Sequence, residues 1–165
     1  MRKFSIGLLY FLVVAACSNS VTKTEELTAK KGKGPETDAQ TQILELAHIS
    51  LEVHGTWSVK KGIDSVAFSI EGKPAGGVDG LGYSESIEST VPNHSEIISK
   101  EELPDTSIRA IKVITKTDIL EGDSTEETHI LFLLEEKNVI YDLHFYSDMI
   151  SSEEMLRMAS SARQI

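Results

Sequence analysis

The strongest constraint on the fold is a pair of apolar segments that flank a short polar one, ETHILFLLEEKNVIYDLHFYS, at residues 127–147. In the first segment Ile130, Phe132 and Leu134 fall on one side of an extended chain. The second segment repeats this alternation, with Val139, Tyr141, Leu143 and Phe145 on the face opposite Asp142 and His144. Two such segments across the polar EEKN predict a β-hairpin. An antiparallel sheet follows, because no long crossover connects the two strands.

Other segments upstream have the alternating pattern of half-buried strands. One of them is interrupted by Gly80 and Gly82, and the longest has apolar residues on both of its faces. The predicted strands are 49–54, 57–60, 65–70, 78–83 and 107–119.

The connections between these strands are predicted from turn residues and from breaks in the pattern. A short helical turn is expected to begin near Ile43 and lead into the first strand. EGKPAGG at 71–77 and EGDST at 121–125 are expected to be turns, and VPNHSEIIS at 91–99 a loop.

The last segment, SSEEMLRMASSARQ, has the pattern of an amphipathic helix. Ser151 with Glu154 three residues later forms a capping box. One apolar stripe contains Met155, Met158, Ala159 and Ala162, so this helix should pack on the sheet. The expectation is a single α+β domain at 43–165, an antiparallel sheet with a C-terminal helix packed on it.

The amino terminus has the layout of a secretory signal peptide. Arg2 and Lys3 precede an apolar run that ends in the small residues Ala15 and Ala16. As a helix, the run from Ile6 to Ala16 would span only about 16 Å at 1.5 Å per residue. A bilayer core is about 30 Å thick, so a permanent transmembrane anchor is not expected.

The sequence Val14-Ala15-Ala16-Cys17 resembles the lipobox of bacterial lipoproteins, in which an aliphatic residue, a small residue and Ala or Gly precede a cysteine. The resemblance implies cleavage of residues 1–16 and a thioether link from Cys17 to diacylglycerol. Two acyl chains hold a protein stably at a membrane, whereas one binds reversibly. The alternative is an ordinary signal peptide with a chance cysteine. A disulfide within the chain is excluded, because there is one cysteine.

Residues 17–42 are expected to form a flexible tether. From Ser18 to Gln42 the large aliphatic residues are Val21 and Leu27, too few to offset the entropy of ordering the chain. The basic cluster AKKGKG within this segment could contact anionic headgroups or cell-wall polymer, or it could simply be solvated.

Net charge limits the partners of the protein. The chain carries a formal charge of −10, and loss of Arg2 and Lys3 with the signal peptide would make it −12. Nucleic-acid binding needs clustered Lys and Arg, so no nucleic-acid partner is expected. Adsorption to an anionic lipid surface is disfavoured for the same reason, whereas basic partners and cations are permitted.

No catalytic, metal or cofactor constellation stands out. The five histidines lie in no metal-binding motif, and no GxSxG elbow marks a nucleophilic serine. His129 and His144 fall on paired strands and could approach each other, but the carboxylates that a metal site would need cannot be placed. The acidic loop LEGDSTEET misses the EF-hand spacing and leaves only weak calcium binding open.

The candidate contact surface consists of the glycine-rich segment GGVDGLGY and the loop VPNHSEIIS. Glycines within a strand mark bulges or places where a ligand or another backbone comes close. The candidate residues are Gly76, Gly77, Gly80, Gly82, Tyr83, Asn93 and His94.

A second resemblance covers most of 49–165. FSIEGKPAGGVDGLGY, PNHSEIIS and EETHILFLLEEKNVIYDLHFYS, with the closing helix, are similar to small extracytoplasmic modules of Gram-positive lipoproteins and of the outer ends of BlaR-type sensor proteins. Such modules resemble the PsbP-like α/β/α sandwich, an antiparallel sheet flanked by helices. The resemblance implies a non-enzymatic binding or accessory role.

The expected function is that of a lipid-anchored module on the extracytoplasmic face of a cell membrane, in a Gram-positive bacterium. It would bind an envelope protein or a small ligand, with no cofactor. Two alternatives remain: a cell-envelope hydrolase that uses His94 with an acidic partner, and a structural surface protein without a dedicated ligand.

Overall fold

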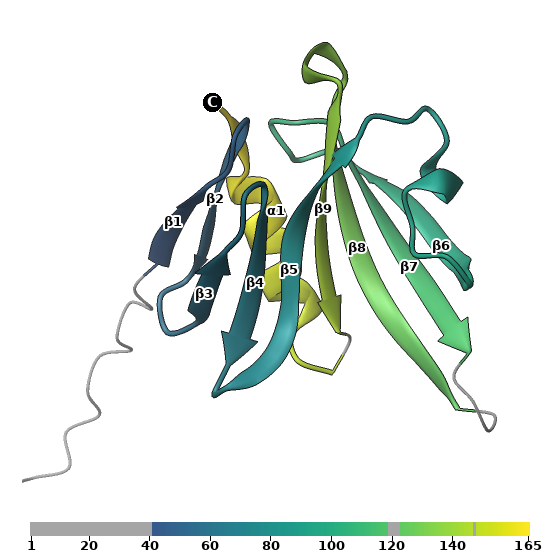
Figure 1. Cartoon of the computed structure of the whole chain (residues 1–165), viewed down its shortest axis with the longest axis horizontal. Coiled ribbons are helices and arrows are strands. Elements are labelled where there is room, and N and C mark those ends of the chain that lie inside the picture. The colour runs from purple at the N-terminus through teal and green to yellow at the C-terminus, as the bar shows by residue number, and fades with distance from the viewer. Residues whose placement is uncertain (1–40, 119–122, 147) are drawn as a thin grey trace, which may run out of the picture. The chain divides into compact units, whose positions relative to one another are not determined.

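The computed structural model describes residues 41–118, 123–146 and 148–165, and these form two antiparallel sheets with one α-helix (Figure 1). The predicted α+β class, with antiparallel strands and a C-terminal helix packed on them, is confirmed, but the described strands form two sheets where one was expected. The larger sheet has the strand order β3 (Ser58–Lys61), β4 (Ser65–Ile70), β5 (Lys73–Gly82), β9 (Val139–Tyr146), β8 (Ser124–Leu134), β7 (Ala110–Asp118) and β6 (Ser95–Leu103). The smaller sheet has the order β1 (Thr41–Glu45), β2 (Ile49–His54) and β10 (Arg163–Gln164).

The predicted hairpin is the centre of the larger sheet. Strands β8 and β9 pair in a register that places His129 opposite His144 and Leu134 opposite Val139. A short 3-10 helix, η2 (Glu135–Lys137), makes the turn, and Asn138 closes it in the left-handed conformation at φ 55°. Asn tolerates this conformation better than most residues, so the polar EEKN segment folds back within four residues.

One face of the larger sheet, the inner face, packs against the smaller sheet and helix α1 (Ser152–Ser161). Ser151 caps this helix, since its Oγ accepts a hydrogen bond from the backbone N–H of Glu154 at 3.2 Å. The helix buries Met155, Met158 and Ala159 of the predicted stripe against side chains that include Phe68, Phe132, Tyr141, Leu143 and Phe145. Ala162 is also buried, but it follows the helix as its extended C-cap residue.

The opposite face, the outer face, presents Gly77, Asp79, His129, Asp142 and His144. A smaller apolar cluster lies on the part of it formed by β7, β8 and β9. The segment between β5 and β6 contributes to this cluster; it contains the 3-10 helix η1 (Ile87–Ser89). The cluster consists of Ile87, Ile111, Val113, Leu131, Leu133 and Ile140, with Leu81, Tyr83, Val91 and Ile97 packed against it.

Predictions of local structure were wrong at three places: near Ile43, at 71–77 and at 91–99. The helical turn expected near Ile43 is strand β1, which pairs with β2 and buries Leu44 while Ile43 stays exposed. The turn expected at 71–77 is confined to Glu71 and Gly72, whose φ angles of 50° and 80° suit a two-residue hairpin turn.

Strand β5 therefore begins at Lys73 and runs to Gly82, longer than the predicted 78–83. Pro74 is tolerated there because the pairing of β4 with β5 is irregular beside it, at Phe68 and Ser69. The loop predicted at 91–99 ends at His94, since Ser95 begins the edge strand β6. Part of the turn predicted at 121–125 lies outside the described residues.

Candidate functional site

A buried polar network crosses three neighbouring strands of the outer face. Nδ1 of His129 lies 2.9 and 3.1 Å from the carboxylate oxygens of Asp142, and Nε2 lies 3.2 Å from Oγ1 of Thr115. When Asp142 is ionised and the ring is neutral, Nδ1 donates to the carboxylate and Nε2 accepts from the threonine hydroxyl. The three residues are almost completely buried: Thr115 is 1% exposed, His129 2% and Asp142 6%. Burial without such partners would be costly.

Three further polar side chains surround this network. His144 lies directly across the strand pair from His129, with ring centroids 6.2 Å apart. Its Nδ1 is 3.7 Å from Oδ2 of Asp79, and Nε2 of His129 is 3.8 Å from Oε2 of Glu127. Asp79 is opposite Asp142 in the register. Like charges placed opposite each other destabilise a sheet. Here each carboxylate also has a histidine diagonally across the strand pair, His144 for Asp79 and His129 for Asp142.

The order Thr115, His129, Asp142 is that of nucleophile, base and orienting acid in hydrolases. Thr115 is almost completely buried, so its hydroxyl is not presented to a substrate. Within residues 41–118, 123–146 and 148–165, no group of three or more His, Cys, Asp or Glu side chains is arranged to hold a metal ion. The hydrogen bonds of the network join β7, β8 and β9 on this face.

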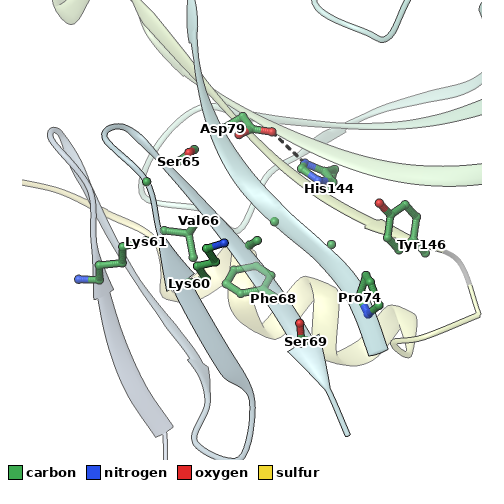
Figure 2. A pocket seen from close by; sticks show the side chains of 14 residues that line it. Lys60, Lys61, Ser65, Val66, Phe68, Ser69, Pro74, Asp79, His144 and Tyr146 are labelled. Carbon is green, nitrogen blue, oxygen red and sulfur yellow. Dashed lines mark ion pairs between the residues drawn. The ribbon is translucent and has the colours of Figure 1, made fainter. Parts of the chain in front are cut away.

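Beside the network the outer face is hollowed where β4 and β5 carry small residues, with β3 along its edge (Figure 2). This strand hollow has a volume of about 440 Å³. His144 and Tyr146 on β9 and Asp79 on β5 form one side, and Lys60 on β3 lies on the other. The floor consists of Ser65, Ala67, Ser69, Gly76 and Gly77.

Glycine is required at the middle of the floor. A Cβ at Gly77 would lie 2.4 Å from the carbonyl oxygen of Val66 and 3.2 Å from Cε1 of His144. Gly76 has a φ of 147°, which side-chain-bearing residues rarely adopt, and a Cβ there would lie 2.1 Å from the carbonyl oxygen of His144. These two glycines therefore allow β5 to approach its neighbours and keep the floor low.

A smaller hollow of about 200 Å³ lies on the other side of His144, next to Pro92. This loop hollow shares Asp79, His144 and Tyr146 with the strand hollow. Its remaining lining residues are Pro92, Glu127, His129 and Asp142. The two hollows together form one polar surface at the border of the apolar cluster.

The structure places the predicted contact residues in different parts of the fold. Gly76 and Gly77 are in the floor of the strand hollow. Gly80 lies against Asp64, where a Cβ would be 2.3 Å from the carboxylate, and Gly82 ends β5 with open space around it. The remaining predicted residues, Tyr83, Asn93 and His94, lie elsewhere.

Tyr83 lines a separate hollow of about 470 Å³ with Arg109 and Glu135. Its burial, together with a hydrogen bond to Glu135, raises the pKa of the Tyr83 phenol. Arg109 is 2.9 Å from Glu102 and 3.3 Å from Glu135, so these three charged side chains of the hollow are already paired with one another.

Asn93 and His94 are exposed on a turn that the backbone N–H of Ser95 closes onto the carbonyl of Pro92 at 3.3 Å. His94 has a φ of 71° and no hydrogen-bond or ion-pair partner in the described part of the chain. The predicted anchor residues, Val14, Ala15, Ala16 and Cys17, lie outside the described residues.

Sequence patterns missed the carboxylates of the site. The proximity expected of His129 and His144 is confirmed, but Asp79, Asp142 and Glu127 were not placed beside them. The alternation that puts Asp142 and His144 on one face was the available signal for Asp142.

No protein-family model and no curated protein matches the chain. The fold and the site by themselves define the chain as a sheet-dominated α+β protein with a polar, hollowed outer face. Among the described residues no helix is long and apolar enough to cross a membrane.

Proposed function

We propose that the chain is an extracytoplasmic lipoprotein with a PsbP-like domain that binds a small ligand on its outer face. The anchor in this proposal is Cys17, at the end of the lipobox-like sequence Val14-Ala15-Ala16-Cys17. The domain would act as a non-enzymatic binding or accessory module at the cell membrane of a Gram-positive bacterium.

The observation that supports a binding role is the strand hollow. Its volume of about 440 Å³ lies within the range of about 300–1,000 Å³ that small-ligand sites occupy. Its floor is built from residues without large side chains, although a sheet face usually carries bulky ones. Polar groups converge on it from β3, β5 and β9, which is typical of a site that orients a ligand.

A hydrolase that uses His94 gains no support from the site. His94 is exposed and has no acidic partner in the described residues. The binding proposal needs no nucleophile, and it uses the face of the sheet that the helix and the smaller sheet do not cover.

Ligand-induced stabilisation tests the binding proposal. The full-length protein in detergent would be screened by thermal unfolding against small soluble compounds, because a ligand that binds the folded state raises the melting temperature. Ala67→Trp should abolish the shift, since Ala67 is exposed in the floor of the strand hollow. Ser99→Trp is the matched control on an exposed position of β6. Equal shifts in the wild type and in Ala67→Trp would contradict the proposal.

A further inference from the structure

We infer that the strand hollow binds a short zwitterionic peptide, with its ammonium group at the Asp79 side and its carboxylate at the Lys60 side. This inference rests on the proposed function and names the class of ligand for the same site.

The acidic side retains free hydrogen-bonding capacity. The Asp79 side chain is 50% exposed, and its ion-pair partner, His144, is 3.7 Å away, beyond the length of a good hydrogen bond. Glu127, on the far side of His144 in the loop hollow, is 3.8 Å from His129. An ammonium group has three donors and can satisfy such acceptors. The Asp79 carboxylate therefore favours a cationic group at this side of the strand hollow, and Glu127 adds negative charge beyond His144.

The basic side lies across the floor. The register places Lys60 opposite Ala67, Ala67 opposite Gly77, and Gly77 opposite His144. Lys60 is thus three strand spacings from His144, about 14 Å between backbones at roughly 4.8 Å per spacing. Figure 2 shows Lys60 and His144 on opposite sides of this floor. Lys60 has no ion-pair partner in the described part of the chain, so its ammonium group is available to a carboxylate.

The two sides together favour a ligand with both charges. A simple anion would meet Asp79 in the hollow and a protein of net charge −10 around it. A simple cation would meet Lys60 and Lys61, which both line the hollow. A zwitterion places each charge next to its opposite, and such complementarity gives specificity. Between the charges, the low floor of Ala67 and Gly77 and the 38% exposed Tyr146 can contact an apolar side chain.

Three related dipeptides test this inference by calorimetric titration of the full-length protein in detergent. The probes are alanyl-phenylalanine, its N-acetyl form, which has no ammonium group, and its C-terminal amide, which has no carboxylate. We expect the free dipeptide to bind, and each blocked form to bind at least about ten-fold more weakly. Equal affinity for the three probes, or no binding of the free dipeptide, would overturn the inference.

Two substitutions assign the ends of the ligand. Asp79→Asn should remove the preference for the free amine over its N-acetyl form, and Lys60→Gln should remove the preference for the carboxylate over the amide. Lys73→Gln is the control, since Lys73 is an exposed lysine at the start of β5 and does not line the hollow. A preference that survives both Asp79→Asn and Lys60→Gln would contradict the inference.

The two proposals fail in different ways. If Ala67→Trp abolishes the stabilisation caused by another compound while no dipeptide binds, only the ligand class is wrong. If no compound distinguishes the wild type from Ala67→Trp, the binding role of the outer face is wrong as well.

Discussion

His144 and Gly77 face each other across β9 and β5, and the imidazole lies over the glycine. Its Cε1 and Nε2 atoms are 3.2 and 3.3 Å from the position that a Cβ at residue 77 would occupy. The same Cβ would lie 2.4 Å from the carbonyl oxygen of Val66, on the other side of β5. One glycine thus permits both the close approach of β4 to β5 and the position of the histidine that separates the two hollows.

Gly77→Ala should destabilise the domain because the carbonyl of Val66 is backbone and cannot move alone. We expect a loss of about 1–3 kcal/mol in the free energy of unfolding, the usual cost of overpacking a well-packed site. Urea denaturation followed by circular dichroism measures this loss.

Gly82→Ala is the matched control for this substitution. Gly82 is also on β5, but nothing lies within 4 Å of its Cβ position and its φ is not in the positive range. It should leave stability within about 0.5 kcal/mol of the wild type. Equal effects of the two substitutions would show that steric crowding at Gly77 is not the reason for the glycine.

Asp142→Leu should destabilise the domain through His129. The substitution removes the partner 2.9 Å from Nδ1 and leaves a buried donor unpaired. The expected cost is about 1–3 kcal/mol. Chemical denaturation of the full-length protein measures it.

A double-mutant cycle separates this hydrogen bond from packing effects. His129→Leu in the Asp142→Leu background removes both polar partners, so the double variant should be more stable than the sum of the two single losses implies. Strict additivity would mean that the two side chains do not interact in the folded protein.

The central hairpin could be predicted because a period of two and a turn of four residues leave little freedom in its pairing. Leu134 opposite Val139 already places His129 diagonal to Asp142. The contact between His129 and Asp142 can therefore be predicted from the sequence once the length of the turn is used to fix which residues pair.

The rest of the site could not be predicted in this way. Asp79 is on β5 and Thr115 on β7, and the register of these strands against the hairpin depends on tertiary packing. Edge strand β6 was missed because it is exposed along most of its length, so burial imposes no alternation on its sequence. The low floor of the strand hollow likewise depends on which small residues become neighbours across β4 and β5.

Tyr141→Phe should make stability less dependent on pH in the alkaline range. The Tyr141 hydroxyl donates a hydrogen bond to Asp64 at 3.1 Å, and burial together with this carboxylate raises the pKa of the phenol from 10.0 to about 12. The folded state therefore holds the proton more strongly than the unfolded chain does. This contribution is complete below pH 10 and is lost as the pH rises to about 12.

At neutral pH, Tyr141→Phe should cost about 0.5–1.5 kcal/mol, the net value of one hydrogen bond. The difference from the wild type should narrow between pH 10 and 12, as measured by urea denaturation at fixed pH values. Tyr146→Phe is the control, because Tyr146 is 38% exposed on the neighbouring outer face. A difference that stays constant across this range would mean that the phenol of Tyr141 does not titrate with an altered pKa.

Cys17→Ala should release the protein from the membrane or leave its signal peptide uncleaved. The reason is that Cys17 is the proposed attachment site of both acyl chains, and two chains are needed for stable anchoring. Membrane fractionation and intact-mass measurement check both outcomes, since loss of the diacylglyceryl group lowers the mass and the retained segment 1–16 raises it. Ser18→Ala, next to the cysteine, should remain anchored and processed. If Cys17→Ala is as firmly attached to the membrane and has as little change in mass as Ser18→Ala, lipidation of Cys17 is refuted. The binding role of the outer face does not depend on this result and would be tested on its own.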